Sequence, residues 1–77
     1  MHYSANLLRQ LRLRIGNNIH HYRIRQKMPL RKLSCLSGVS ENLLDCYELG
    51  KYEISLADLL KISCALKVDF NDLMLCK

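Results

Sequence analysis

The sequence predicts an all-α fold in which five helices pack into one compact domain. Apolar residues recur at three- and four-residue steps along most of the chain, and this spacing places them on one face of a helix. One proline and three glycines in 77 residues are too few for a sheet rich in tight turns. A chain of this length holds a single hydrophobic core, and an apolar share of 49% is enough to fill it.

The first helical pattern starts after Ser4, whose hydroxyl can cap a helix, and it extends to about Gln26. Its apolar stripe consists of Leu8, Leu11, Ile15, Ile19 and Tyr22. Gly16 weakens this pattern because glycine is a poor helix former. Two interpretations follow: one long helix, or an extra amino-terminal helix followed by a second one that starts at about Ile15.

A second core helix is expected from about Leu30 to Ser37. It follows Pro29, and proline is tolerated in the first turn of a helix because its missing N–H would have no partner there. We expect Leu33 and Leu36 to share the face of this helix that points to the core.

Gly38 can adopt the left-handed backbone conformation that ends this helix, and Val39 is expected to fill the corner that follows. Ser40 then caps a third helix, which closes at Gly50. The core-facing residues of the third helix are Leu43, Leu44 and Tyr47. Two short helices joined by such a corner form a helix-turn-helix, a unit of about 18 residues that is typical of DNA-binding proteins.

Two further helices complete the fold. Ser55 can cap the fourth, and Asp69 can cap the fifth. The stripe of the fourth helix consists of Leu56, Leu59, Ile62, Ser63 and Leu66. The fifth helix contains Phe70, Leu73 and Met74. No internal repeat, low-complexity tract or long linker separates these helices.

The charge is distributed unevenly along the chain. Residues 1–32 carry eight Arg and Lys residues and no acid, whereas residues 33–77 carry four Lys and seven acids. The net charge is therefore +8 for residues 1–32 and −3 for residues 33–77. This difference suggests that the protein has one face suited to binding a polyanion. We divide the chain into a basic amphipathic amino-terminal extension, residues 1–14, and a helix-turn-helix domain, residues 15–77.

Several short motifs occur in a fixed order. They are I-G-x-x-I at Ile15 to Ile19, Arg23 four residues further, L-S-x-x-S-G-V-S at Leu33 to Ser40, Y-E-x-G-K at Tyr47 to Lys51, and L-x-x-L-L-K-I at Leu56 to Ile62. With these motifs the chain resembles the lambda-repressor-like family of DNA-binding domains, also called XRE or Cro. The resemblance implies five helices, with the helix-turn-helix formed by the second and third.

The resemblance also implies specific residue roles. In the family an arginine at the place of Arg23 pairs with a glutamate at the place of Glu48, and the pair locks the third helix to the first. Leu30 stands where family members often have a phosphate-binding glutamine, and Ile54 stands where a proline is usual. The exposed positions of the third helix by family alignment are Ser40, Glu41, Asn42, Asp45 and Cys46. That face has two carboxylates and no Arg, Lys or Gln.

The function predicted from these features is a sequence-specific transcriptional regulator that binds duplex DNA. The helix that starts at Ser40 enters the major groove, where Asn42 contacts a base and Glu41 and Asp45 discriminate between base pairs. The residues expected to bind phosphate are Lys51, Arg31 and Arg14. A homodimer is expected because Phe70, Met74 and Leu75 give the last helix more apolar surface than it needs in its own domain.

A second function remains open. The acidic third helix would also suit a protein-interaction module that has lost DNA reading, such as a heterodimer partner of a related regulator or an anti-repressor. Catalysis is not expected, because the chain has no Gly-rich phosphate loop, no H-E-x-x-H and no G-x-S-x-G.

No cofactor or metal is expected. The cysteines, at positions 35, 46, 64 and 76, form no C-x-x-C pair, so reduced thiols are the simplest interpretation, with redox sensing or a disulfide as alternatives. His20 and His21 point about 100° apart on a helix, which favours surface histidines. No apolar run is long enough to span a membrane, and no signal peptide precedes the domain, so we expect a cytoplasmic protein.

Overall fold

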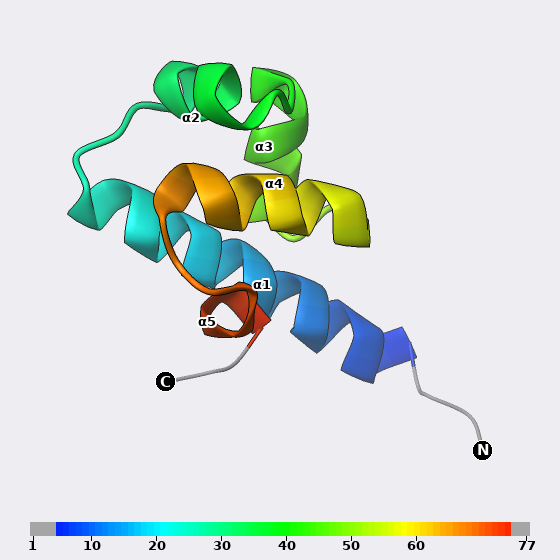
Figure 1. Cartoon of the computed structure of the whole chain (residues 1–77). Helices are drawn as coiled ribbons and strands as arrows, with labels where there is room; N and C mark the ends of the chain where they lie inside the picture. The colour runs from blue at the N-terminus through cyan, green and yellow to red at the C-terminus, as the bar shows by residue number, and fades with distance from the viewer. Residues whose placement is uncertain (1–4, 75–77) are drawn as a thin grey trace.

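The computed structural model describes residues 5–74. It contains α1 (Ala5–Arg25), α2 (Leu30–Ser37), α3 (Glu41–Glu48), α4 (Leu56–Leu66) and α5 (Phe70–Met74), as shown in Figure 1. This confirms the all-helical prediction and the order of the five helices. α1 runs unbroken through Gly16, so the interpretation as one long helix is the one observed. The expected cap Ser4 lies outside the described residues.

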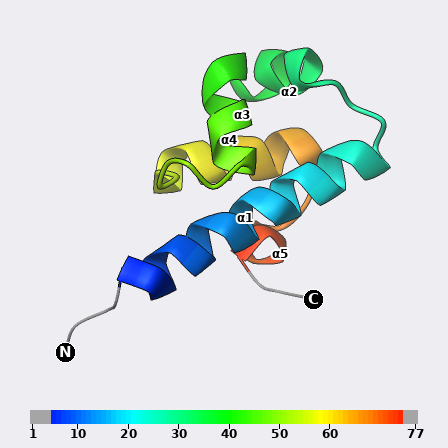
Figure 2. The same cartoon turned by 180° about the vertical axis from the view of Figure 1, so that it is seen from behind.

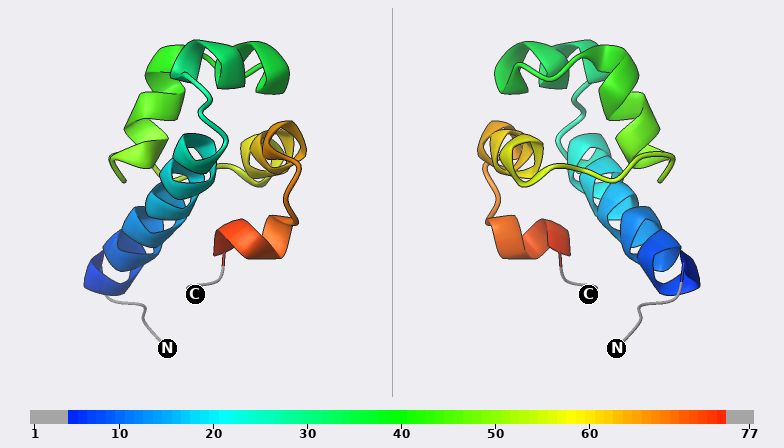
Figure 3. Two further views of the ribbon diagram at one scale, coloured as in Figure 1. Left: turned by 90° about the vertical axis from the view of Figure 1, so that its left-hand side faces the viewer. Right: turned by 90° about the vertical axis from the view of Figure 1, so that its right-hand side faces the viewer.

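α1 is the longest helix, and α3, α4 and α5 contact it, whereas α2 packs on α3 and α4. α4 also packs on α5 (Figures 1 and 2). α2 and α3 meet at an angle at one end of the molecule, and α5 lies at the other end (Figure 3). In both opposed views the amino-terminal turns of α1 project beyond the body formed by the other helices (Figures 1 and 2).

Every helix contributes to a single core. The fully buried large side chains are Ile19 of α1, Leu33 of α2, Leu44 of α3, Ile62 and Leu66 of α4, and Leu73 of α5. Removing each from water stabilises the fold by about 1.5–3 kcal/mol. Because α5 has only five residues, its Leu73 must be held by the neighbouring helices and not by the helix itself.

Some residues expected in the core are exposed instead. Leu36 is 55% exposed, because the eight-residue α2 turns Ser37, four positions after Leu33, toward the core in its place. Leu56 is 64% exposed at the first position of α4. Leu8 and Leu11 are also exposed, since the projecting turns of α1 have less of the other helices packed on them. The division of the chain between residues 14 and 15 falls inside α1 and stays a prediction.

Gly16 marks the closest approach between α1 and α3. A Cβ at this position would lie 2.8 Å from the carbonyl oxygen of Glu48 and closer still to that of Tyr47. Both obstacles are backbone atoms, which cannot move aside as a flexible side chain can. The glycine that weakens the helical pattern is therefore the residue that lets the end of α3 rest on α1.

We expect Gly16→Ala to destabilise the protein by at least about 3 kcal/mol, although alanine is the better helix former by roughly 1 kcal/mol. The reason is overlap with the carbonyl oxygens of Tyr47 and Glu48. Urea unfolding followed by circular dichroism measures the change. Gly38→Ala is the control: it meets nothing within 4 Å and should cost only about 1–2 kcal/mol for its left-handed backbone. Equal losses in the two variants would contradict the packing argument.

Candidate nucleic-acid interface

The corner between α2 and α3 is built from three residues. Gly38 has φ 77° and ends α2, and its amide donates to the carbonyl of Ser34. The Ser34 hydroxyl donates to the carbonyl oxygen of Val39 at 2.7 Å, and Val39 is buried. The predicted roles of Gly38 and Val39 are confirmed, and the two helices are held at a fixed angle.

α3 has one buried face and one free face. The Ser40 hydroxyl accepts a hydrogen bond from the Leu43 amide at 3.1 Å, which confirms the predicted cap. Leu44 and Tyr47 are buried. The exposed residues at the start and along the outer face are Ser40, Glu41, Asn42 and Asp45. The structure therefore brings these four predicted site residues together on one polar surface.

The carboxyl end of α3 is tied to α1 by an ion pair. Arg23 Nε lies 2.6 Å from Glu48 Oε2, and Arg23 Nη2 lies 3.0 Å from Oε1. Both side chains are largely buried, at 10% and 6% exposed. The hydrogen bond to Glu48 raises the pKa of Arg23. Arg23 Nη1 also donates to the carbonyl oxygen of Met28 at 2.8 Å, so the same guanidinium holds the link before α2.

His20 joins this pair, and sequence analysis did not anticipate that contact. Its Nδ1 lies 2.8 Å from Glu48 Oε1, and its side chain is half exposed. Arg23 Nη2 lies 3.3 Å from the same nitrogen. The spacing in the sequence could have indicated this contact, because residues three apart on a helix are neighbours and His20 therefore lies beside Arg23. Glu48 is thus shared between an arginine and a histidine.

We expect Glu48→Gln to destabilise the protein by about 3–5 kcal/mol, because the Arg23 charge would stay buried without its counter-charge. Thermal unfolding followed by circular dichroism measures the effect. The matched control is Glu41→Gln, which makes the same chemical change at an exposed position of α3 and should change stability little. Melting of Glu48→Gln at the wild-type temperature would show that the pair does not support the fold.

A side-chain hydrogen bond connects α3 to α4. The Tyr47 hydroxyl donates to Asp58 Oδ2 at 2.6 Å, and Tyr47 is only 6% exposed. Burial first, and then this hydrogen bond, raises the pKa of Tyr47 to about 12. The Ser55 hydroxyl accepts from the Asp58 amide at 3.1 Å, which confirms the predicted cap of α4 and positions the acceptor.

The stability of the protein should fall between about pH 10 and pH 12. The unfolded chain loses the Tyr47 proton near pH 10, whereas the folded chain keeps it to about pH 12, so rising pH favours unfolding across that window. Urea unfolding at several pH values should show a loss of about 2–3 kcal/mol. In Tyr47→Phe this part of the loss should disappear. An unchanged pH profile in Tyr47→Phe would contradict the assignment.

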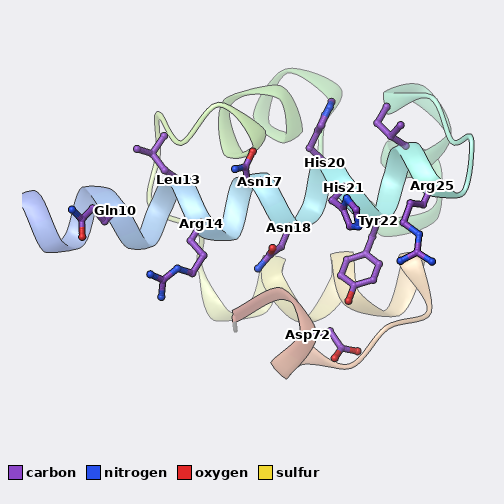
Figure 4. A pocket seen from close by; sticks show the side chains of 11 residues that line it. Gln10, Leu13, Arg14, Asn17, Asn18, His20, His21, Tyr22, Arg25 and Asp72 are labelled. Atoms are coloured by element: carbon purple, nitrogen blue, oxygen red, sulfur yellow. The ribbon is translucent and has the colours of Figure 1, made fainter. Parts of the chain in front are cut away.

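The predicted phosphate-binding residues do not all lie together. Arg31 is exposed in the first turn of α2, and Lys51 is exposed in the link that follows α3. Arg14 projects toward the α5 side of α1, as does Asn18, which bonds the Leu73 carbonyl at 2.9 Å (Figure 4). Arg14 therefore does not share the face of α3. This position could not be foreseen, because the sequence does not say which side of α1 each neighbouring helix covers.

The described part of the chain shows neither a metal site nor a membrane span. Among residues 5–74, no three His, Cys, Asp or Glu side chains are close enough to hold a metal ion. No helix in the same range is long and apolar enough to cross a membrane. Cys35, Cys46 and Cys64 are free thiols.

The fold and the free outer face of α3 define a helix-turn-helix protein. A model of the helix-turn-helix family HTH_3 matches residues 19–73. The chain belongs to this family, which is of the lambda-repressor-like, or XRE, type. The resemblance seen in the sequence is thereby confirmed. Membership supports the coarse function of a DNA-binding transcription regulator and points away from an enzyme.

Two solved structures share the fold. One is the restriction-modification controller protein C.AhdI from Aeromonas hydrophila, with 24% sequence identity, a TM-score of 0.78, and coverage of 80% of this chain and 94% of that one. The other is the hypothetical transcription factor NHTF from Neisseria, with 24% identity, a TM-score of 0.81, and coverage of 87% and 78%. A search of curated proteins gave no match.

Proposed function

We propose that this protein is a sequence-specific transcriptional regulator that reads duplex DNA as a homodimer, with α3 in the major groove. The observation that carries the proposal is the division of α3 into two faces. Its inner face and its carboxyl end are fixed by Tyr47, Glu48 and the core. Its outer face presents the exposed polar side chains of Glu41, Asn42 and Asp45. A rigidly mounted helix with a free polar face is what major-groove reading requires.

The residues of this face have different roles in the proposal. Asn42, in the first turn of α3, donates to and accepts from an adenine edge. Glu41 and Asp45 accept from the amino group of cytosine, and they repel phosphates and wrong base pairs. Because these acids oppose DNA binding, the attraction must come from elsewhere. Lys51 is exposed in the link that follows α3, and Arg31 is exposed in the first turn of α2.

The two proteins of similar structure are compatible with this role. One is a controller protein of a restriction-modification system, and the other is a hypothetical transcription factor. A regulator of gene expression is therefore the proposed role of this chain as well.

The second candidate function is a protein-binding module. The observation in its favour is the presence of Glu41 and Asp45, both exposed, on the face that would otherwise meet DNA. A basic partner surface would suit this face directly. The two functions differ in one respect that can be measured: only a DNA reader loses base discrimination when Asn42 is changed.

We expect Asn42→Ala to relax the preference at one base position by about 1–3 kcal/mol and to leave nonspecific affinity nearly unchanged. Binding to random-sequence and selected duplexes across a salt series measures both quantities. Lys51→Ala is the contrasting variant: it should weaken all sequences similarly and lower the salt slope by about 0.9. If the protein binds no duplex with any preference and Asn42→Ala weakens a protein partner, the proposed function is wrong.

A further inference from the structure

An apolar groove lies at the amino-terminal end of α1, away from the Arg23–Glu48 pair. Its apolar lining includes Leu8 and Leu11 of α1, Leu56 of α4, and Phe70 and Met74 of α5. Leu8, Leu11 and Leu56 are 41%, 38% and 64% exposed. Apolar side chains from three elements that converge in this way and stay open to water mark an interaction surface.

The groove also contains one charge of each sign. Arg12 comes from α1, and Glu53 comes from the link between α3 and α4. Among residues 5–74 neither side chain is in an ion pair. Arg12 Nε donates to the Gly50 carbonyl oxygen at 3.4 Å, which leaves both Nη groups free to bond a carboxylate from outside.

We propose that this groove receives a second copy of the chain through a two-fold contact, in which Arg12 of each copy pairs with Glu53 of the partner subunit. This inference rests on the homodimer in the proposed function and specifies how it forms. In a two-fold contact the same surface serves both copies, so a groove with one positive and one negative wall is complementary to itself. The exposed leucines of the two copies then bury each other.

The residues that line the groove favour a second copy of the chain over other binding partners. A phosphate-bearing surface, whether DNA or an anionic membrane, would be repelled by Glu53 and would gain nothing from Leu56, Phe70 and Met74. Leu8, Leu11 and Arg12 precede the residues that the family model matches. The contact therefore uses the projecting turns of α1, which lie outside the matched residues.

The test is a charge exchange measured by sedimentation equilibrium. Arg12→Glu alone and Glu53→Arg alone each place two like-charge contacts in the interface, so each should raise the dimer dissociation constant at least about a hundredfold. An equimolar mixture of the two variants restores both opposite-charge pairs, and it should associate as tightly as the wild type within about threefold. Because rescue requires two folded chains, the mixture also excludes misfolding as the cause.

Arg9→Glu is the matched control, since it makes the same charge change on an exposed residue of α1 that does not line the groove. It should dimerise like the wild type. A wild type that stays monomeric at 100 micromolar, single variants that dimerise normally, or a mixture that fails to recover would each overturn the inference. The proposed DNA reading fails separately, because its test is the base preference lost in Asn42→Ala.

Discussion

The ion pair between Arg23 and Glu48 is the interaction on which the placement of the helix-turn-helix depends. One guanidinium bonds the end of α3 through Glu48 and the link before α2 through the Met28 carbonyl. Both helices of the motif are therefore attached to α1 at a single side chain. Burying two charges costs several kcal/mol, and here the cost is offset because most of their hydrogen-bonding groups have partners, including His20.

The residues that fix α3 in place are different from the residues that α3 exposes on its outer face. A helix of eight residues is too short to be stable alone, so its conformation depends on contacts with α1 and α2 and on its hydrogen bond to α4. Gly16 allows the backbone approach, and Tyr47 bonds Asp58 on the opposite side. None of these contacts uses the outer residues. The outer face can therefore carry two acids, Glu41 and Asp45, without any loss of packing.

Features that depend on neighbouring residues could be predicted well from the sequence, whereas contacts between helices far apart in the chain could be predicted less well. The caps at Ser40 and Ser55 and the corner at Gly38 depend on a few adjacent residues, and all three are observed. Periodicity correctly identifies which residues share a helix face, but it does not show where the neighbouring helix ends. That is why Leu36 and Leu56 were placed in the core and are exposed. The Arg23–Glu48 contact was expected only through resemblance to a family.

α1 connects the two surfaces to which functions are assigned. Arg12, in the proposed dimer groove, and Arg23, which holds α3, are eleven residues apart on one unbroken helix, a rise of about 16 Å. A helix cannot change this distance without breaking backbone hydrogen bonds. If two copies meet at the groove, the position of each α3 relative to its partner is then fixed by α1 and by the Arg23–Glu48 pair. Since half-sites on DNA repeat at multiples of one helical turn, such a rigid connection is the physical basis for reading both half-sites together.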